Sequence, residues 1–151
     1  MKEIELTQGY VALIDNEDFD WINQHKWNTL TGYYNKKYAF NTTAGLMHRF
    51  ILDTPPDMEV DHKDGNTLNN QRSNIRNCTK SQNLMNKKKY GKGKYKGVSW
   101  HPVNNKWRAR ITYEHTEYFL GYFDEEDDAA RAYNVMAKVL CGDFAVMNDV
   151  Q

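Results

Sequence analysis

The first 57 residues carry short apolar runs separated by polar turns. The run 10–14 predicts a strand, because it ends at an Asp-Asn pair that favours a turn. The aromatic residues between 21 and 40 are interpreted as packing residues of a small sheet, with base stacking as the alternative. The run 47–52 fits either a helix or a strand, and the two prolines that follow end it.

Residues 58–88 predict two short strands and a helix. The strands are expected at 58–62 and 74–77, and the Gly- and Asn-containing segment between them is predicted to be a loop. Thr79 begins a capping-box pattern with a glutamine three residues later, so a short helix is expected at 80–88.

The stretch from 95 to 148 predicts three strands followed by one helix. The strands are expected at residues 97–101, 106–113 and 117–123. Asp124 is expected to cap the helix, whose apolar residues recur at three- and four-residue steps until Gly142 ends it. The whole chain is therefore predicted to be an α+β protein, with the C-terminal part a three-stranded antiparallel sheet packed on one helix.

The central strand of this group has two different faces, because side chains alternate along a strand. One face is apolar and is expected to pack on the helix: Trp107, Ala109, Ile111 and Tyr113. The other face is polar and must point away from the helix: Arg108, Arg110 and Thr112. The two arginines either read bases or merely keep an exposed sheet face soluble.

Composition excludes several classes of protein. The chain is 40% hydrophobic and 13% aromatic, which disfavours bulk disorder. No window approaches the ~18 apolar residues of a membrane span, and the N-terminus lacks the apolar core of a signal peptide, so a cytoplasmic protein is expected. Cys78 and Cys141 form no CxxC pair, which argues against a zinc ribbon or a disulfide framework.

Charge is distributed unevenly although the net charge is zero. Residues 71–110 hold twelve lysines and arginines and no aspartate or glutamate. A solvated linker flanked by surface lysines is the plain interpretation. An acid-free stretch of this length instead predicts contact with a polyanion, and double-stranded DNA is the expected partner.

The segment 60–88 carries a pattern of residues that are able to take part in catalysis. It reads VDHKDGNTLNNQRSNIRNCTKSQNLMNKK and places an Asp-His pair at a predicted strand end, with asparagines in the loop and in the following helix. This pattern resembles HNH homing endonucleases of the phage and intron type, which have a small ββα-metal nuclease core. One difference is Asn70, where the family more usually has aspartate. The Met47-His48-Arg49 stretch also resembles that family, so His48 is a candidate to support the site.

The residues of this pattern suit phosphodiester hydrolysis. Asp61 and Asn83 offer two oxygen ligands with one negative charge, a set that favours one Mg²⁺ or Mn²⁺ per site over zinc. His62 is expected to act as the general base, because its unperturbed pKa of ~6.5 suits proton transfer near neutral pH. The resemblance adds Asn74 to the catalytic group with Asp61 and His62, as the residue that fastens the loop.

The third stretch resembles the plant ethylene-response-factor (apetala-type) DNA-binding domain. The segments KGV, KWRARI, LGYF, AARAY and GDFAVMN occur in that order. The resemblance implies that the outer sheet face reads the DNA major groove, whereas Ser99 and Glu117 replace the arginines usual in plant members. Predicted DNA-binding residues of the whole chain are Arg72, Arg76, Lys87, Lys88, Lys89, Lys92, Lys94, Lys96, Ser99, His101, Arg108, Arg110, Thr112 and Phe119.

Together these observations predict a site-specific DNA endonuclease with two domains. The expected division is a nuclease domain at 1–88 with its core at 58–88, a basic linker at 89–94 and a DNA-reading domain at 95–151. A monomer or homodimer without small-molecule cofactor or membrane attachment is expected, encoded by a phage or mobile element and acting in a bacterial host. A non-enzymatic DNA-binding regulator with a degenerate nuclease fold is the alternative, and an RNA-directed or structure-specific nuclease is a third.

Overall fold

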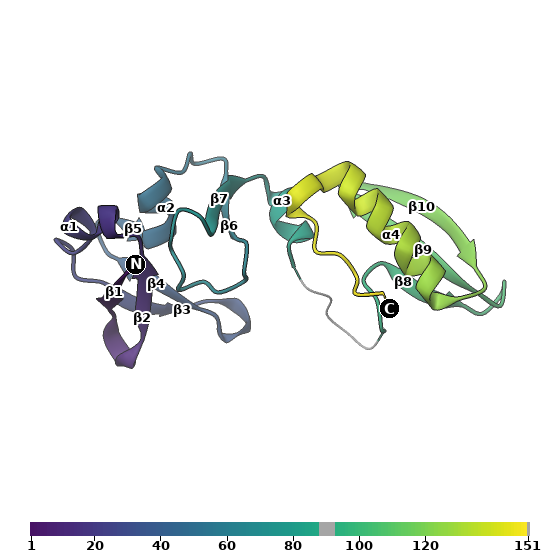
Figure 1. The fold of residues 1–151 in the computed structure, drawn as a ribbon, viewed down its shortest axis with the longest axis horizontal. Coiled ribbons are helices and arrows are strands. Elements are labelled where there is room, and N and C mark those ends of the chain that lie inside the picture. Colours follow the sequence, from purple (N-terminus) through teal and green to yellow (C-terminus); the bar gives the residue numbers. More distant parts are fainter. Residues whose placement is uncertain (88–92, 151) are drawn as a thin grey trace. The chain divides into compact units, whose positions relative to one another are not determined.

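The computed structural model describes residues 1–87 and 93–150, and the chain divides into two compact units, Met1–Lys80 and Ser81–Gln151. Figure 1 shows the order of their elements. The strands are β1 (Lys2–Glu5), β2 (Val11–Ile14), β3 (Asn28–Thr31), β4 (Lys37–Asn41), β5 (Gly45–Leu46), β6 (Glu59–His62), β7 (Ile75–Cys78), β8 (Val98–His101), β9 (Lys106–Tyr113) and β10 (Thr116–Phe123). The α-helices are α1 (Phe19–Ile22), α2 (Met47–Leu52), α3 (Lys80–Met85) and α4 (Glu126–Cys141).

The first unit is built from small antiparallel sheets around one core. Strand β1 pairs with β2, and β4 lies between β3 and β5. Apolar side chains from these strands, α1, α2 and β7 form a shared core, with Trp27 only 2% exposed. The strand predicted at 10–14 and the sheet predicted for the aromatic segment are therefore present.

The run 47–52, for which the pattern allowed two structures, is helix α2. The helix ends at Asp53, which takes the left-handed conformation. Arg49 then donates to the backbone carbonyls of Thr54, Pro55 and Met58, at 3.3, 2.8 and 2.7 Å. These bonds hold the proline turn that leads the chain into β6.

Strands β6 and β7 form an antiparallel hairpin, and α3 follows directly. The predicted order of strand, loop, strand and helix is thus found. The long loop between the strands, residues 63–74, is tied to β2 by two backbone bonds of 2.8 Å, from Leu13 N to Leu68 O and from Asn70 N to Leu13 O. The loop therefore has a fixed path despite its polar composition.

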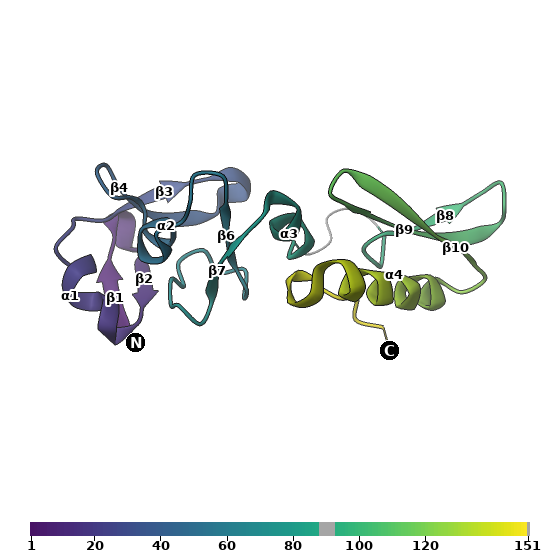
Figure 2. The same ribbon diagram turned by 90° about the horizontal axis from the view of Figure 1, so that it is seen from above.

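The second unit is a three-stranded antiparallel sheet in the order β10-β9-β8, with α4 lying along one face (Figures 1 and 2). Alternation along β9 is as predicted, because Ala109 and Ile111 are buried against α4 while Arg110 and Thr112 are exposed. Gly97 has a φ of +75°, and a Cβ there would overlap the ring of Tyr133 on α4. Glycine at this position therefore permits the close approach of strand and helix.

Helix α3 packs within this second unit. Met85 at its end is 4% exposed and lies in the core with Ile111 and Tyr133. Lys96 donates its ammonium hydrogens to the carbonyl oxygens of Met85 and Lys87, at 2.8 and 3.0 Å. A cation at the C-terminal end of a helix satisfies carbonyls that have no partner in the helix.

The predicted cap of the long helix is wrong by one residue. Glu125 is the N-cap residue of α4, and it makes no side-chain cap bond. The Asp124 carboxylate instead pairs with Lys106 at 2.7 Å. The acidic first turn and the stop at Gly142 are as expected.

No helix in residues 1–87 and 93–150 is long and apolar enough to cross a membrane. The predicted division into 1–88, 89–94 and 95–151 stays a prediction, because residues 88–92 lie outside the described part of the chain.

Candidate nuclease site

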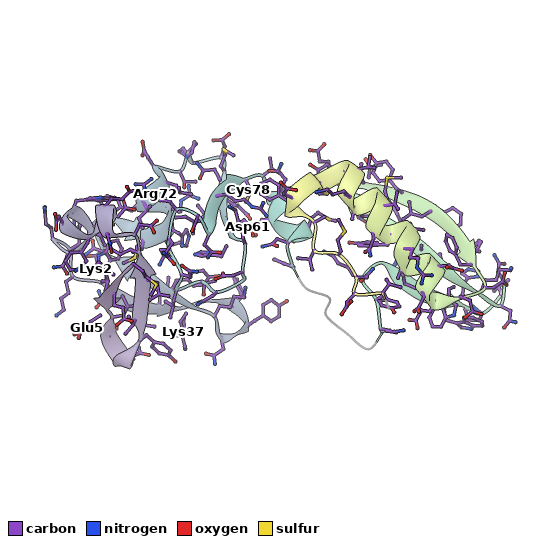
Figure 3. The ribbon with its side chains drawn as sticks, viewed as in Figure 1. Lys2, Glu5, Lys37, Asp61, Arg72 and Cys78 are labelled. Carbon is purple, nitrogen blue, oxygen red and sulfur yellow. The ribbon has the colours of Figure 1, made fainter. Side chains whose placement is uncertain are left out.

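The end of strand β6 presents the two residues of the Asp-His pair. Asp61 is 2% exposed and His62 is 6% exposed. Successive side chains leave a strand on opposite faces, so the carboxylate and the imidazole point in different directions. Figure 3 places Asp61 on this hairpin, near Cys78 on β7. Two buried polar groups at one strand end require specific partners.

Asp61 is held by Arg76, its cross-strand neighbour on β7. The guanidinium Nη2 and Nε of Arg76 lie 2.8 and 2.9 Å from Oδ2 of Asp61. A buried carboxylate needs a compensating charge, and Arg76 supplies it to Asp61. Arg76, predicted to contact phosphate, thus has a positioning role in this structure.

His62 is oriented by Asn70 in the loop. The ring Nε2 of His62 lies 3.2 Å from Oδ1 of Asn70, which is fully buried. The amide nitrogen of Asn70 faces the carbonyl of Leu68 at 3.3 Å and Sδ of Met47 at 3.4 Å, which fixes the amide orientation. An amide oxygen only accepts, so neutral His62 carries its hydrogen on Nε2 and its lone pair on Nδ1.

A second histidine lies against the first. His48 on α2 is 6% exposed, and its ring centroid is 5.0 Å from that of His62 in an edge-on arrangement. Burial is the main cause that lowers the pKa of His48, and together with the charges of His62 and Arg49 it brings that pKa to about 3. Burial also lowers the pKa of His62, against the opposite effects of Asn70, Asp64 and Asp61. Both rings are therefore neutral near pH 7.

The stability of the first unit should fall in mild acid. Below pH ~6.5 His48 binds a proton in the unfolded chain, whereas in the folded chain it is buried and stays neutral until about pH 3. The free energy of unfolding therefore falls by up to ~1.4 kcal/mol per pH unit in this range. Urea unfolding at about pH 7.5 and about pH 5 measures this loss. His48→Leu should lose part of the pH dependence, and exposed His115→Asn should keep it. An unchanged pH dependence in His48→Leu would contradict the assignment.

Asn74 fastens the loop, as the resemblance implies. Its amide nitrogen donates to Oδ1 of Asp64 at 3.0 Å and to the carbonyl of Asn69 at 2.8 Å. Its amide oxygen accepts from the backbone N–H of Asp64 at 3.1 Å. Both polar atoms of the Asn74 side chain are therefore engaged in shaping the loop.

Arg72 anchors the other end of the loop. Its Nη2 and Nε donate to the carboxylate of Asp18 at 2.7 and 2.9 Å, and Asp18 is 2% exposed. Asp15 accepts from the backbone N–H of Arg72 at 2.8 Å and from the side chain of Gln71 at 3.0 Å. The predicted phosphate contact of Arg72 stays a prediction, whereas its contact with Asp18 is a structural role that the sequence did not reveal.

The predicted metal ligands lie in different units, each described by itself. Asp61 lies on β6 in the first unit, and Asn83 lies on α3 in the second. Among the described residues no group of three or more His, Cys, Asp or Glu side chains forms a metal site. A carboxylate and an amide oxygen remain the expected donors, a set that fits a hard cation such as Mg²⁺.

The other predicted DNA-binding residues fall into two groups. Lys94 pairs with Asp127 at 2.9 Å, and Lys96 is partly buried at the end of α3. Lys87 is exposed, and Lys88, Lys89 and Lys92 lie outside the described residues. The sheet of the second unit carries the remainder on the face away from α4: Ser99, His101, Arg108, Arg110, Thr112 and Phe119.

This outer sheet face has two features of a binding surface. An aromatic row crosses it, with ring centroids 5.0 Å apart from His101 to Tyr122 and from Tyr122 to Phe119, which is 57% exposed. Beside it, Oγ of Ser99 and Nε of Arg108 are buried and have no hydrogen-bond partner in the described structure. Such buried polar atoms cost about 1–3 kcal/mol each unless a ligand satisfies them.

Comparison with known proteins gives the family. Residues 53–85 match the HNH endonuclease family. An uncharacterized HNH endonuclease, L560, of Acanthamoeba polyphaga mimivirus is 31% identical over 149 residues, which cover 95% of this chain and 77% of that protein. The chain therefore belongs to the HNH endonuclease family.

The second unit has separate relatives in plants. The AP2/ERF and B3 domain-containing transcription factor RAV1 of Arabidopsis thaliana is 50% identical over 48 residues, 32% of this chain and 14% of that protein. The transcription repressor TEM1 of the same plant is 39% identical over 61 residues, 40% of this chain and 17% of that protein. The matched stretches thus span a small part of these plant proteins, and the likeness lies in the C-terminal part of this chain.

Proposed function

We propose that this chain is a site-specific DNA endonuclease whose first unit supplies the hydrolytic residues and whose second unit reads sequence. The observation that carries the proposal is the His62 ring, buried beside Asp61 and fixed by Asn70 as the tautomer with its lone pair on Nδ1. That nitrogen is suited to take a proton from an attacking water, which is the task of a general base. Membership of the HNH endonuclease family supports the same conclusion.

The proposed metal ligands are the Asp61 carboxylate and the Asn83 amide oxygen, with one Mg²⁺ or Mn²⁺. When bound, such an ion supplies charge stabilisation to the phosphate in the transition state. The chain's own residues do the rest of the work at the site. Arg76 orients Asp61, Asn70 keeps the His62 hydrogen on Nε2, and Asn74 holds the shape of the loop.

Cleavage of duplex DNA tests the proposal. The chain would be incubated with a randomised duplex library and Mg²⁺ or Mn²⁺, and the cut ends on both strands would be sequenced. Cutting at a shared sequence supports a site-specific nuclease, and binding to a shared sequence without cutting would indicate a regulator instead. The viral source of one relative makes viral and host DNA suitable second substrates.

The outer sheet face of the second unit is proposed to read base pairs. A β-ribbon fits the width of the major groove, and arginine is the commonest specific partner of guanine. The exposed ion pair of Arg110 with Glu117, at 2.7 Å, is worth only about 0–1 kcal/mol, so Arg110 can exchange it for a base. Glu117 near the same base pair adds an acceptor suited to the cytosine amino group.

Replacing Arg110 by alanine should therefore cost about 1–3 kcal/mol at the preferred sequence and relax preference at one base pair. Binding selections on randomised DNA would measure both effects. Arg131→Ala is the matched control, because Arg131 is an equally exposed arginine on α4 that pairs with Asp128. An unchanged base preference in Arg110→Ala would show that this part of the sheet does not read sequence.

A further inference from the structure

The tip of the β3–β4 hairpin, residues 32–36, is anchored beside the nuclease residues. Thr67 in the 63–74 loop donates its hydroxyl hydrogen to the carbonyl of Lys37 at 2.5 Å, at the start of β4. Next along β4, the ring of Tyr38 lies 5.8 Å from that of His48, which in turn lies 5.0 Å from that of His62. These contacts connect the hairpin to the loop and to the histidine pair.

Lys36 carries a charge without a partner at this position. Its side chain is partly buried, and no hydrogen bond or ion pair of its ammonium group is found in residues 1–87 and 93–150. Burial is the main cause of the lowered pKa of His62, and the positive charge of Lys36 contributes in the same direction. Neighbouring Lys37 differs, because it binds Thr31 at 2.8 Å and Asn35 at 3.0 Å. Lys36, two residues before the Tyr38 ring that contacts the histidine pair, is thus available to an anion.

The hairpin tip is also aromatic and free of acidic residues. Tyr33 is 92% exposed and Tyr34 is 80% exposed. Gly32 shapes the tip, because a Cβ there would lie 2.8 Å from the Tyr38 ring. Residues 21–52 contain no aspartate or glutamate and hold four basic residues, so the charge of this region suits a polyanion.

We propose that Lys36 binds a DNA phosphate at the nuclease site and that the hairpin tip contacts the duplex beside the bond that is cut. The proposal rests on the proposed nuclease function and adds a binding element to it. A partly buried ammonium group gains from a phosphate partner because the exchange offsets its lost hydration. Exposed tyrosine rings beside it provide flat surfaces that pack against sugars and bases.

Two measurements on Lys36→Gln test the proposal. Binding to a mixed-sequence duplex in EDTA, over a range of salt concentrations, reports phosphate contacts without cleavage. Loss of one contact should reduce the slope of log affinity against log salt by about 0.9. Cleavage by the full chain at saturating DNA and Mg²⁺ should slow by about 10–100-fold, because a charge that stabilises the transition state is lost.

Lys26→Gln is the matched control. Lys26 is an exposed lysine of the same acid-free stretch, and it precedes β3, at the end of that strand away from the hairpin tip. It should retain the wild-type slope and rate. Tyr33→Ser should weaken binding severalfold without changing the unfolding midpoint, because the ring is almost fully exposed. A wild-type slope and a wild-type rate in Lys36→Gln would overturn the proposal. A wild-type chain that binds but never cuts would overturn the nuclease function instead, while the salt slope still tests the phosphate contact.

Discussion

Replacing Asp61 by alanine is expected to abolish DNA cleavage while leaving DNA affinity almost unchanged. The variant removes the only charged member of the proposed metal-ligand pair, and it also leaves the 17% exposed side chain of Arg76 without its carboxylate partner. Losing a ligand to the proposed cation should lower the rate by at least about 10³-fold, the scale of a missing electrostatic contact in a site. Cleavage of a labelled duplex under single-turnover conditions would measure the loss.

A second variant separates chemistry from folding. Asp61→Asn preserves the shape of the side chain and removes its charge, so the hairpin should fold while cleavage remains lost. Thermal unfolding of both variants shows whether Asp61→Ala fails only because the ion pair with Arg76 is broken, which costs up to about 3–5 kcal/mol when a buried partner is removed. Full cleavage by the wild type in EDTA would exclude the metal assignment altogether.

Local pattern was enough to predict most elements of the second unit. Alternation along β9 identifies its buried face, and the three- and four-residue steps of α4 identify the helix face, because both depend on the strand and helix periods alone. The cap of α4 was misplaced because Asp124 and Glu125 are both acidic and adjacent. Asp124 pairs with Lys106 on β9, a contact between distant residues that the local pattern does not show.

The residue types of the candidate site could be predicted from the sequence, but the hydrogen-bond and ion-pair partners of these residues could not. The resemblance to HNH endonucleases selected Asp61, His62 and Asn74 as candidates, and the structure places all three at the β6–β7 hairpin and its loop. The sequence did not identify the roles of Arg72 and Lys96. Arg72 reaches Asp18 across 54 residues, and Lys96 reaches the end of α3. Both basic residues were expected to bind phosphate because they lie in the acid-free stretch, and only tertiary contacts distinguish a cation that supports the fold from one that is free for a ligand.

The same limit applies to Asn70 and Lys36. Asn70 stood out only as a departure from the family pattern, and its contact with His62 depends on the folded loop. For Lys36 a signal was present, because residues 21–52 form a second acid-free stretch. That signal is weak, since it includes Lys37 and Arg49, which the structure engages in hydrogen bonds.

Replacing His62 by alanine is expected to slow cleavage by about 10²–10⁴-fold, the usual contribution of a positioned general base.

The pH dependence of the wild type provides an independent check. A protonated imidazole cannot accept a proton, so the rate must fall once pH drops below the pKa of His62. Because burial lowers that pKa from 6.5, the rate should stay near its plateau down to pH 6.5 and then fall about tenfold per pH unit below the lowered pKa. Single-turnover rates at saturating metal, between about pH 5 and about pH 8, would show this profile. The His115→Asn variant should reproduce it, because His115 is exposed, belongs to the second unit and is not among the proposed nuclease residues. A rate that already declines between pH 8 and pH 6.5 would mean that His62 is not the base.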